Sequence, residues 1–327
     1  MDVVRLNIQN LRCGYGKHVV PIYEITTELI KPTLVALTGK NGTGKSTLLR
    51  TLAGILRPLN GKILINNNEL HNLSNLQRSS QIAFLPSYNA KIPYLKVTDY
   101  VSLGKLKQDK NQNPNNDTIY ELLHKVDMES KANHFLTQLS DGEMQRVAIA
   151  RILYQNSNIL LFDEPTAHLD PKQQHKVLNL LFQITTEQNK IIIFSSHMTD
   201  MVLTYAHKIW LLGEEYFIDK IPEQIIIDKD FEKNELTLAS RNWLSMQTKS
   251  GLNVRVLGDG LVYQYTKFAF LRYGIETHCN KHCHFSVIIQ QNPEGKYSWL
   301  VKKEQQVLKE FTNLELLINY LLKFYKL

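Results

Sequence analysis

Cysteine is scarce in this chain of 327 residues, which contains Cys13, Cys279 and Cys283 alone. Three cysteines at such uneven spacing do not make the disulfide framework of a small secreted domain, so a reducing cytosol is the simplest compartment. No run of about 18 apolar residues occurs either, and the sequence therefore predicts no membrane-spanning helix. The opening segment MDVVRLNIQN lacks a basic region followed by an apolar run, so we expect no signal peptide.

A strong excess of one charge is also missing from most of the chain, as are internal repeats and low-complexity segments. The net charge of +7 comes mainly from residues 241–327, where 12 Lys and Arg face 6 Asp and Glu. A basic patch is typical of proteins that bind nucleic acid or anionic lipid. Here the charges are scattered singly, with Lys302 and Lys303 the one adjacent pair. We therefore favour a solvated surface and expect no nucleic-acid partner.

Short apolar runs alternate with helical patterns over the first 235 residues or so. The runs at 33–39, 158–164 and 191–196 are nearly continuous, as a sheet buried on both faces requires. Because helical patterns separate such runs, they predict a parallel sheet. The segments 3–14 and 61–67 alternate polar and apolar residues instead, which indicates antiparallel strands with one exposed face.

The pattern changes twice further along the chain. Residues from about 88 to 150 are mainly helical in character, and the polar stretch 107–117 indicates an exposed connection. After residue 240, strand patterns and an amphipathic terminal helix predict a separate α+β domain. We therefore predict an α/β domain over 1–235, with an antiparallel β subdomain and a helical subdomain at about 88–150, followed by an accessory C-terminal α+β domain at 241–327.

Residues 39–47, GKNGTGKST, match the phosphate-binding pattern G-x-x-x-x-G-K-[ST] between a predicted strand and a predicted helix. Glycines allow tight turns whose N–H groups converge on phosphate, and the helix N-terminus adds its positive end. Lys45 is expected to reach the β- and γ-phosphates of ATP, and the Ser46 hydroxyl to bind Mg²⁺. A chance match in a glycine-rich turn would not explain the strand and helix on either side, so the motif predicts a P-loop NTPase. The predicted nucleotide-binding residues are Gly39, Asn41, Gly42, Gly44, Lys45, Ser46 and Thr47.

Asp163 and Glu164 end the apolar run ILLF at 159–162. Ligands of open α/β sheets bind at the carboxyl ends of the strands, which is where these two carboxylates lie. Asp163 is placed to hold Mg²⁺, directly or through water. Glu164 points to the other side and can orient and deprotonate the attacking water. A strand-end pair that caps a loop is the alternative, and the phosphate loop makes it the weaker one.

LSDGE at 139–143 resembles the LSGGQ signature of ATP-binding cassette (ABC) ATPases, with Asp141 and Glu143 as departures. In that family the signature contacts the γ-phosphate of ATP bound by the partner subunit. The resemblance therefore implies that Ser140 and Gly142 supply a hydroxyl and an N–H in trans. An ordinary helix N-cap box is the alternative interpretation of these residues.

Three more positions match the family in order, and the resemblance covers roughly residues 3–235. Tyr15 matches the aromatic that stacks on adenine, Asp170 the D-loop, and His197 the switch histidine that contacts the γ-phosphate. Taken singly, Tyr15 could be a core aromatic and His197 a structural histidine. The resemblance implies an ATP hydrolase that uses ATP and Mg²⁺, with Lys45, Glu164 and His197 in the catalytic centre. It further implies a head-to-tail homodimer and transmembrane permease subunits as partners.

Ser87, in IAFLPS at 82–87, departs from the family pattern. The family usually places a glutamine there, which touches Mg²⁺ and the water and senses the permease. We expect hydrolysis to survive this change, because the glutamine is an auxiliary ligand rather than the base. Purified protein without ATPase activity that Ser87→Gln restores would contradict this expectation.

VTDYVSLGKL at 97–106 resembles the TVRDYVALGR of the ATPases of iron-siderophore, haem and vitamin B12 importers. This resemblance implies import of such a compound, with a solute-binding protein as an indirect partner. It places the chain peripherally at the cytoplasmic face of the inner (cell) membrane. Two alternatives stay open: an ABC exporter ATPase, and a soluble ABC ATPase regulated by its C-terminal domain.

The C-terminal part contains one group of candidate metal ligands: His278, Cys279, His282, Cys283 and His284. Such residues within a short segment can bind Zn²⁺ or iron. A structural zinc site usually needs a second pair of ligands elsewhere, and none is apparent in the sequence. An ordinary strand or turn is therefore the favoured interpretation.

Overall fold

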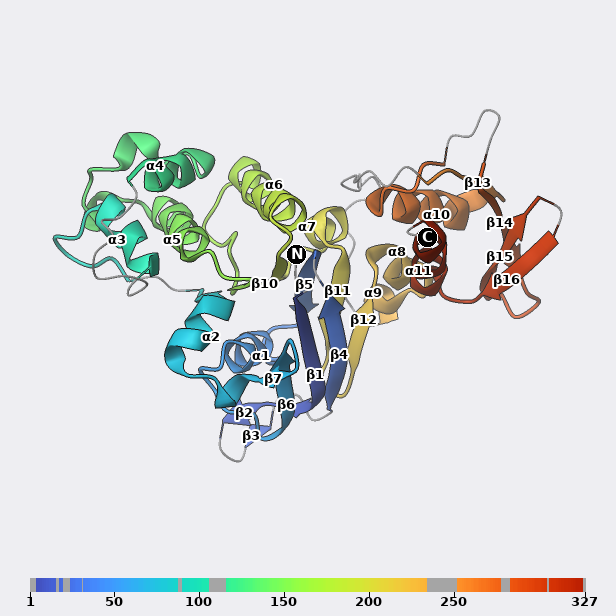
Figure 1. Cartoon of the computed structure of the whole chain (residues 1–327), viewed down its shortest axis with the longest axis horizontal. Helices are drawn as coiled ribbons and strands as arrows, with labels where there is room; N and C mark the ends of the chain where they lie inside the picture. Colours follow the sequence, from blue (N-terminus) through green and yellow to red (C-terminus); the bar gives the residue numbers. More distant parts are fainter. Residues whose placement is uncertain are drawn as a thin grey trace. The chain divides into compact units, whose positions relative to one another are not determined.

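The computed structural model describes residues 4–15, 18–19, 24–30, 32–87, 90–105, 116–233, 252–277, 283–304 and 306–325. The chain divides into two compact units, whose elements are labelled in Figure 1. Unit 1 comprises residues 1–197 and 210–218, and unit 2 comprises 198–209 and 219–327. Among the described helices, not one has the length and apolar character needed to cross a membrane.

Unit 1 contains most of a six-stranded sheet of order β12-β11-β5-β10-β9-β8. β5, β9 and β10 are buried along their whole length, and β8, β9, β10 and β5 run parallel. Burial on both faces is what their continuous apolar sequences predict. The strands are β5 (Thr33–Gly39), β8 (Ile82–Leu85), β9 (Ile159–Phe162), β10 (Ile191–Ser195), β11 (Lys208–Leu212) and β12 (Phe217–Lys220).

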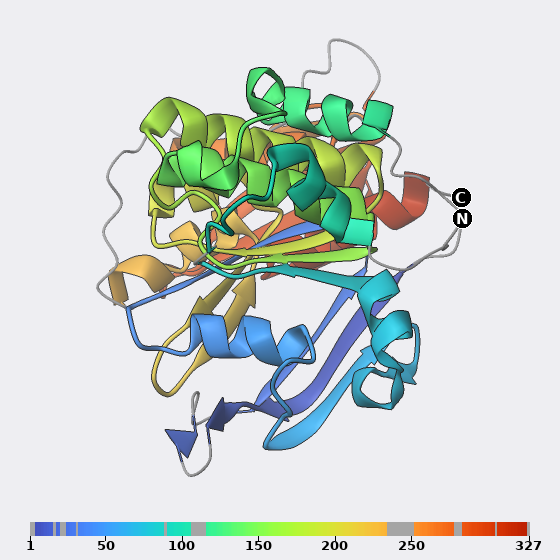
Figure 2. The same ribbon diagram turned by 90° about the vertical axis from the view of Figure 1, so that its left-hand side faces the viewer.

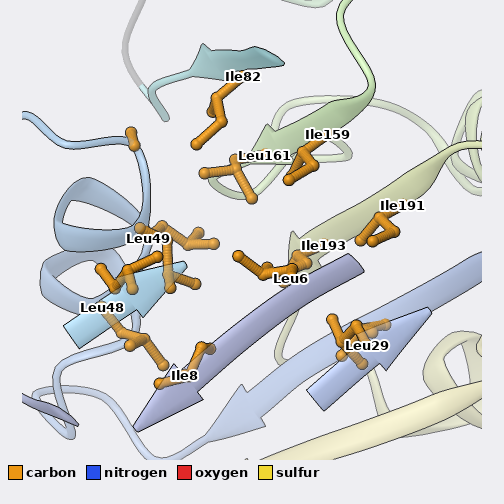
Figure 3. Close-up of a cluster of buried hydrophobic side chains, with 14 of the residues drawn as sticks. Leu6, Ile8, Leu29, Leu48, Leu49, Ile82, Ile159, Leu161, Ile191 and Ile193 are labelled. Carbon is orange, nitrogen blue, oxygen red and sulfur yellow. The ribbon is translucent and has the colours of Figure 1, made fainter. Parts of the chain in front are cut away.

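A second, antiparallel sheet of order β4-β1-β6-β7 completes the β structure of unit 1, beside a small β2–β3 hairpin. Figure 2 shows α1 between the two large sheets. Leu48 and Leu49 of α1 pack there in one apolar cluster with Leu6, Ile159 and Ile193 (Figure 3). The elements are α1 (Lys45–Leu52), β1 (Arg5–Arg12), β2 (Gly14–Tyr15), β3 (His18–Val19), β4 (Ile25–Ile30), β6 (Asn60–Ile65) and β7 (Asn68–Glu69).

Helices α3, α4 and α5 pack together as the helical part of unit 1 (Figures 1 and 2). Ser140 caps the N-terminus of α5, and Asp170 caps α6, whose first residue is a proline. Such caps satisfy the free N–H groups of a helix start. The predicted exposed connection at 107–117 lies largely outside the described residues. The helices are α2 (Asn75–Gln81), α3 (Val97–Ser102), α4 (Asn116–Lys125), α5 (Asp141–Gln155) and α6 (Pro171–Glu187).

Unit 2 contains a four-stranded sheet of order β13-β14-β15-β16, in which β13 and β14 are parallel and the other pairs antiparallel. Its core joins one face of this sheet with apolar residues of α10 and α11. The predicted α/β class with an α+β extension is confirmed. The elements are α7 (Thr199–Tyr205), α8 (Pro222–Ile227), α9 (Asp230–Lys233), β13 (Val254–Leu257), α10 (Gly260–Arg272), β14 (Phe285–Gln291), β15 (Tyr297–Lys303), β16 (Gln306–Phe311) and α11 (Leu314–Tyr325).

Residues 198–209 and 219–233 belong to unit 2, although they precede the domain boundary that the sequence predicts. That boundary falls within residues 234–250, which are outside the described part of the chain. The division of the chain into domains at 1–235 and 241–327 therefore stays a prediction.

His207 makes the stability of unit 2 dependent on pH. Burial, with a smaller contribution from the Arg272 guanidinium, lowers the pKa of its imidazole to about 3. An unfolded histidine takes up a proton near pH 6.5, so stability is complete above that pH and is lost as the pH falls toward 3. Between pH 6.5 and pH 5 we expect the unfolding free energy to decrease by about 2 kcal/mol. Hydrogen exchange of the β14 and β15 amides measures this; an identical pH slope in His207→Gln would contradict the assignment.

Candidate functional site

The phosphate loop connects β5 to α1 through a backbone that requires glycine. Gly39, at the end of β5, has φ +148°, and a Cβ there would lie 2.2 Å from the Leu212 carbonyl oxygen. Gly44 has φ 93° and precedes α1, which has neither a side-chain N-cap nor an acidic residue in its first turn. The positive end of α1 is therefore left for an external anion such as phosphate.

Lys45 lies inside this loop and is 7% exposed. Its Nζ donates hydrogen bonds to the carbonyl oxygens of Gly39, at 2.8 Å, and Lys40, at 3.0 Å. Burial lowers the pKa of Lys45, and the nearby carboxylates of Glu164 and Asp163 oppose this shift. The fold thus brings the phosphate-loop lysine close to both predicted carboxylates.

Asp163 follows β9 and is 1% exposed. Its N–H donates to the Leu85 carbonyl at 2.8 Å, and its Oδ1 accepts a hydrogen bond from the Ser195 hydroxyl at 2.8 Å. Its Oδ2 is buried and has no hydrogen-bond partner. An anionic oxygen without a partner is costly inside a protein unless a cation offsets its charge.

Glu164 has a φ of +50°, a conformation that residues other than glycine seldom adopt. Two contacts hold this backbone: the Glu164 N–H donates to Ser195 Oγ at 2.7 Å, and the Glu164 carbonyl accepts from Ala167 at 3.1 Å. The half-buried carboxylate lies 3.9 Å from Nδ1 of His197, whose side chain is exposed. The predicted base and the predicted switch histidine are therefore neighbours.

The residues present suit a divalent oxygen-ligated cation such as Mg²⁺. Asp163 supplies a buried, unpartnered carboxylate oxygen, and Ser46 supplies a hydroxyl in the first turn of α1. Mg²⁺ prefers such oxygen ligands, together with waters and substrate phosphates. The donor set therefore agrees with the metal ligands that the sequence predicts.

Ser195, the last residue of β10, is a site residue that the sequence analysis missed. It is fully buried, and one hydroxyl serves both carboxylate residues, donating to Asp163 and accepting from the Glu164 N–H. The available signal was its position at the carboxyl end of a buried strand. No motif marks a serine there.

Removal of this hydroxyl in Ser195→Ala is expected to reduce ATP turnover about 10- to 100-fold, as for other residues that orient metal ligands. The Mg²⁺ concentration for half-maximal activity should rise, because Asp163 loses the group that orients it. Phosphate release measured across a Mg²⁺ titration tests this. Ser196→Ala, at the next position, is the control, and equal effects of the two changes would contradict the assignment.

Ser140 and Glu143 form a reciprocal capping box at the start of α5. The Glu143 N–H donates to Ser140 Oγ at 3.3 Å, and the Ser140 N–H donates to Glu143 Oε2 at 2.9 Å. A hydrogen bond from Lys131, with help from the Ser140 backbone, lowers the pKa of Glu143 to about 2. A Cβ at Gly142 would lie 3.0 Å from the His168 carbonyl oxygen, so this position has little room for a side chain. The N-cap alternative therefore describes the geometry of LSDGE, and the contact in trans stays a prediction.

Tyr15 is 48% exposed, and its hydroxyl accepts a hydrogen bond from Arg50 at 3.1 Å. It is therefore a surface aromatic rather than a core residue. Asp170 accepts a hydrogen bond from the Gln173 N–H at 3.0 Å as the N-cap of α6. Ser87 is exposed and follows β8, the neighbour of β9 in the sheet. The nucleotide-binding role of Tyr15, the dimer role of Asp170 and the effect of Ser87 stay predictions.

The candidate metal segment at 278–284 lies mostly outside the described residues. Of its described members, Cys283 takes part in a disulfide, and Nδ1 of His284 accepts a hydrogen bond from the Asn253 N–H at 3.3 Å. In the described part of the chain, no group of three or more His, Cys, Asp or Glu residues could hold a metal ion. Because most of the segment lies outside the described residues, both interpretations of it stay predictions.

Two family models match the chain. The model described as ABC transporter matches residues 23–167, and the Iron ABC transporter C-terminal domain model matches residues 251–322. An uncharacterized ABC transporter ATP-binding protein of Methanocaldococcus jannaschii is 35% identical over 218 residues, which are 65% of this chain and 84% of that protein. A petrobactin import ATP-binding protein of Bacillus anthracis is 31% identical over 231 residues, 68% and 84% of the two chains.

A solved structure of an ATP-binding cassette dimer is also similar to the chain. It is described as a post-hydrolysis state of MJ0796 bound to ADP and phosphate, and it matches with a TM-score of 0.60 at 26% identity. The match covers 66% of this chain and 98% of the other. Nearly the whole of a known cassette is therefore represented here, and residues 251–322 have a family match of their own.

Proposed function

Because the chain belongs to the ATP-binding proteins of ABC transporters, we propose that it energises the import of an iron chelate. Members of this family hydrolyse ATP, pair as cassette dimers and work with transmembrane permease subunits. The chain is accordingly an ATP hydrolase that energises a transporter. The transported compound and the direction of transport are the parts that we propose.

The match of residues 251–322 to the iron transporter C-terminal domain carries this proposal. It is independent of the resemblance of VTDYVSLGKL, within the cassette, to importer ATPases. The relative whose name gives petrobactin import supports the same assignment. An exporter ATPase or a soluble regulated ABC ATPase would leave the match of this domain unexplained.

The site residues have separable roles in the proposed reaction. Lys45 and the N–H groups of the phosphate loop bind the β- and γ-phosphates, and Tyr15 stacks on the adenine. Ser46 and Asp163 would hold Mg²⁺, which offsets phosphate charge when it is bound. Glu164 orients the attacking water and takes its proton.

Contacts to the γ-phosphate come from both subunits of the proposed dimer. His197, beside Glu164, contacts it from the same subunit. Ser140 and Gly142 contact it from the partner subunit, and Asp170 communicates across the dimer interface. Each cassette thus contributes half of two sites, so we expect ATP to close the dimer and hydrolysis to reopen it.

The proposed setting is the cytoplasmic face of the inner (cell) membrane, where the dimer binds two permease subunits. A solute-binding protein delivers the iron chelate to the permease on the other side. Uptake of ⁵⁵Fe-siderophore by cells that carry Glu164→Gln in the chromosomal gene tests this proposal. We expect uptake to fall to background, whereas Glu187→Gln, at the exposed end of α6, should leave it unchanged.

Haem and cobalamin uptake are measured in the same cells, because either could replace the siderophore as the transported compound. Normal uptake of all three in the Glu164→Gln cells would overturn the proposed import. Loss of efflux of another compound would indicate the exporter alternative instead.

A further inference from the structure

The chain passes from unit 1 to unit 2 directly after the predicted switch histidine. His197 is the last residue of the first segment of unit 1, and Met198 opens the 198–209 segment of unit 2. β10 ends at Ser195, whose hydroxyl contacts the Asp163 carboxylate and the Glu164 backbone N–H, and α7 begins at Thr199. His197 thus lies in the short connection between an element of the site and a helix of the other unit.

Arg272, the last residue of α10, holds the C-terminal end of α7. Its Nη2 donates to the Leu203 carbonyl at 2.8 Å, and its Nη1 donates to the carbonyls of Thr204, at 3.1 Å, and Ala206, at 2.9 Å. The last carbonyls of a helix have no partner within the helix. A cation that binds these carbonyls also interacts favourably with the helix dipole.

Glu223 of α8 uses the remaining donors of Arg272. Its Oε1 accepts from Nε at 3.1 Å and from Nη2 at 2.9 Å, and both side chains are 0% exposed. A guanidinium has five N–H donors in a fixed plane, and these contacts occupy all of them. The orientation of Arg272 is therefore determined from two sides, by α8 and by the end of α7.

Three further contacts hold the residues just after α7. The hydroxyl of Tyr273 donates to the His207 carbonyl at 3.2 Å. Lys208 Nζ pairs with Asp219 at 2.9 Å and with Glu315 of α11 at 3.0 Å. Arg272, Tyr273 and Glu315, all within the segment matched as an iron transporter C-terminal domain, thus fix the chain from 203 to 208.

We propose that Arg272, oriented by Glu223, is a positioning residue for ATP hydrolysis that acts through α7 on His197. It fixes the C-terminal end of the helix that directly follows the histidine, and we expect loss of this contact to change how His197 is held. A buried ion pair contributes little net stability compared with apolar residues of similar volume, and determining one arrangement is its better attested use. The inference rests on the proposed role of His197 in the reaction.

The first test is Arg272→Lys in the full-length protein. Lysine keeps a positive charge beside Glu223, but its single ammonium cannot bridge three carbonyls and a carboxylate in one plane. We expect kcat for ATP hydrolysis to fall about tenfold while the affinity for ATP changes less than about twofold, since the phosphate loop is untouched. Hydrogen exchange of residues 199–206 should accelerate.

Lys220→Met is the matched control. Lys220 also lies in unit 2 and also forms ion pairs, with Asp228 at 2.7 Å and Asp230 at 2.6 Å, but these contacts do not involve α7. A purely structural role of ion pairs in unit 2 predicts similar effects on kcat for the two variants. The proposal predicts an effect for Arg272→Lys alone.

A double-mutant cycle with His197→Ala gives the decisive result. If Arg272 acts through His197, then Arg272→Lys should have no further effect on single-turnover hydrolysis once His197 is absent. An equal reduction with and without His197, or wild-type kcat in Arg272→Lys, would overturn the inference. If Arg272→Lys does not fold, the pair Arg272→Met with Glu223→Leu removes all five donors without leaving a buried charge, and the same cycle applies.

Failure of the proposed function gives a different pattern. In that case wild-type protein would lack ATPase activity, or His197→Ala would hydrolyse ATP at the wild-type rate. If the Arg272 inference alone fails, wild-type protein still hydrolyses ATP and His197→Ala still slows hydrolysis. Only the result of the double-mutant cycle then differs from the prediction.

Discussion

Glu164→Gln is expected to remove ATP turnover while ATP binding stays intact. Glutamine has the size and shape of glutamate but cannot take a proton from water at neutral pH. General-base catalysis typically contributes 10²- to 10⁴-fold, so turnover should fall by about three orders of magnitude. Because the phosphate loop and Asp163 are unchanged, ATP should remain bound and hold the cassettes together as a closed dimer.

The structure gives two reasons to expect that this substitution affects the chemical step and not the fold. The Glu164 backbone is held by contacts of its own N–H and carbonyl groups, which glutamine keeps. The carboxylate is half-buried, with the His197 ring at 3.9 Å, so the change does not open a cavity in the core. Loss of turnover can therefore be assigned to chemistry rather than to unfolding.

Phosphate release measures the loss of turnover, and light scattering in saturating ATP measures the closed dimer. Glu187→Gln serves as the control, since Glu187 is exposed at the end of α6. Wild-type turnover in Glu164→Gln would show that another group is the base. A monomer in saturating ATP would contradict the shared-site mechanism.

The central sheet of unit 1 was predictable because its strands carry the simplest sequence pattern. β5, β9 and β10 are buried on both faces, and a strand in that environment is apolar at every position. β16 shows the opposite case. Its sequence QVLKEF has a single buried residue, Phe311, and an exposed edge strand carries little periodicity.

Ser195 could not be predicted from the sequence because its role depends on strand order. Phe162 of β9 pairs with Phe194 of β10 in parallel register, so the next residues, Asp163 and Ser195, meet at one edge of the sheet. The neighbours β9 and β10 are separated by the whole of α6 in the sequence. The motif residues of the site are visible locally, whereas the residue that orients them is determined by tertiary structure.

Arg272, in the C-terminal part, is likewise a residue whose role depends on tertiary structure. The sequence indicates a helix end there, and an arginine at a helix end is ordinarily solvated. Its burial follows from contacts with α7 and with Glu223, which lie 66 to 69 and 49 residues away in the sequence. No local pattern identifies such a pair, so the link between the accessory domain and the segment after His197 appears only in the structure.

Lys45→Ala is expected to produce the converse of Glu164→Gln, with loss of ATP binding itself. Hydrogen bonds to charged groups contribute about 1.5–3 kcal/mol each, and Lys45 should make two with the phosphates. It must first release its bonds to the Gly39 and Lys40 carbonyls, which offsets part of this gain. We therefore expect a net loss of about 3 kcal/mol, or about a hundredfold in affinity.

Calorimetric titration of ATP into proteins that also carry Glu164→Gln measures this loss without interference from turnover. Lys40→Ala is the matched control, because Lys40 is an exposed neighbour in the same loop and its carbonyl survives the change. Unaltered affinity in Lys45→Ala would show that backbone N–H groups alone bind the phosphates. Equal losses in both variants would indicate a general effect of positive charge rather than a specific contact of Lys45, since an exposed lysine and a buried one would then contribute alike.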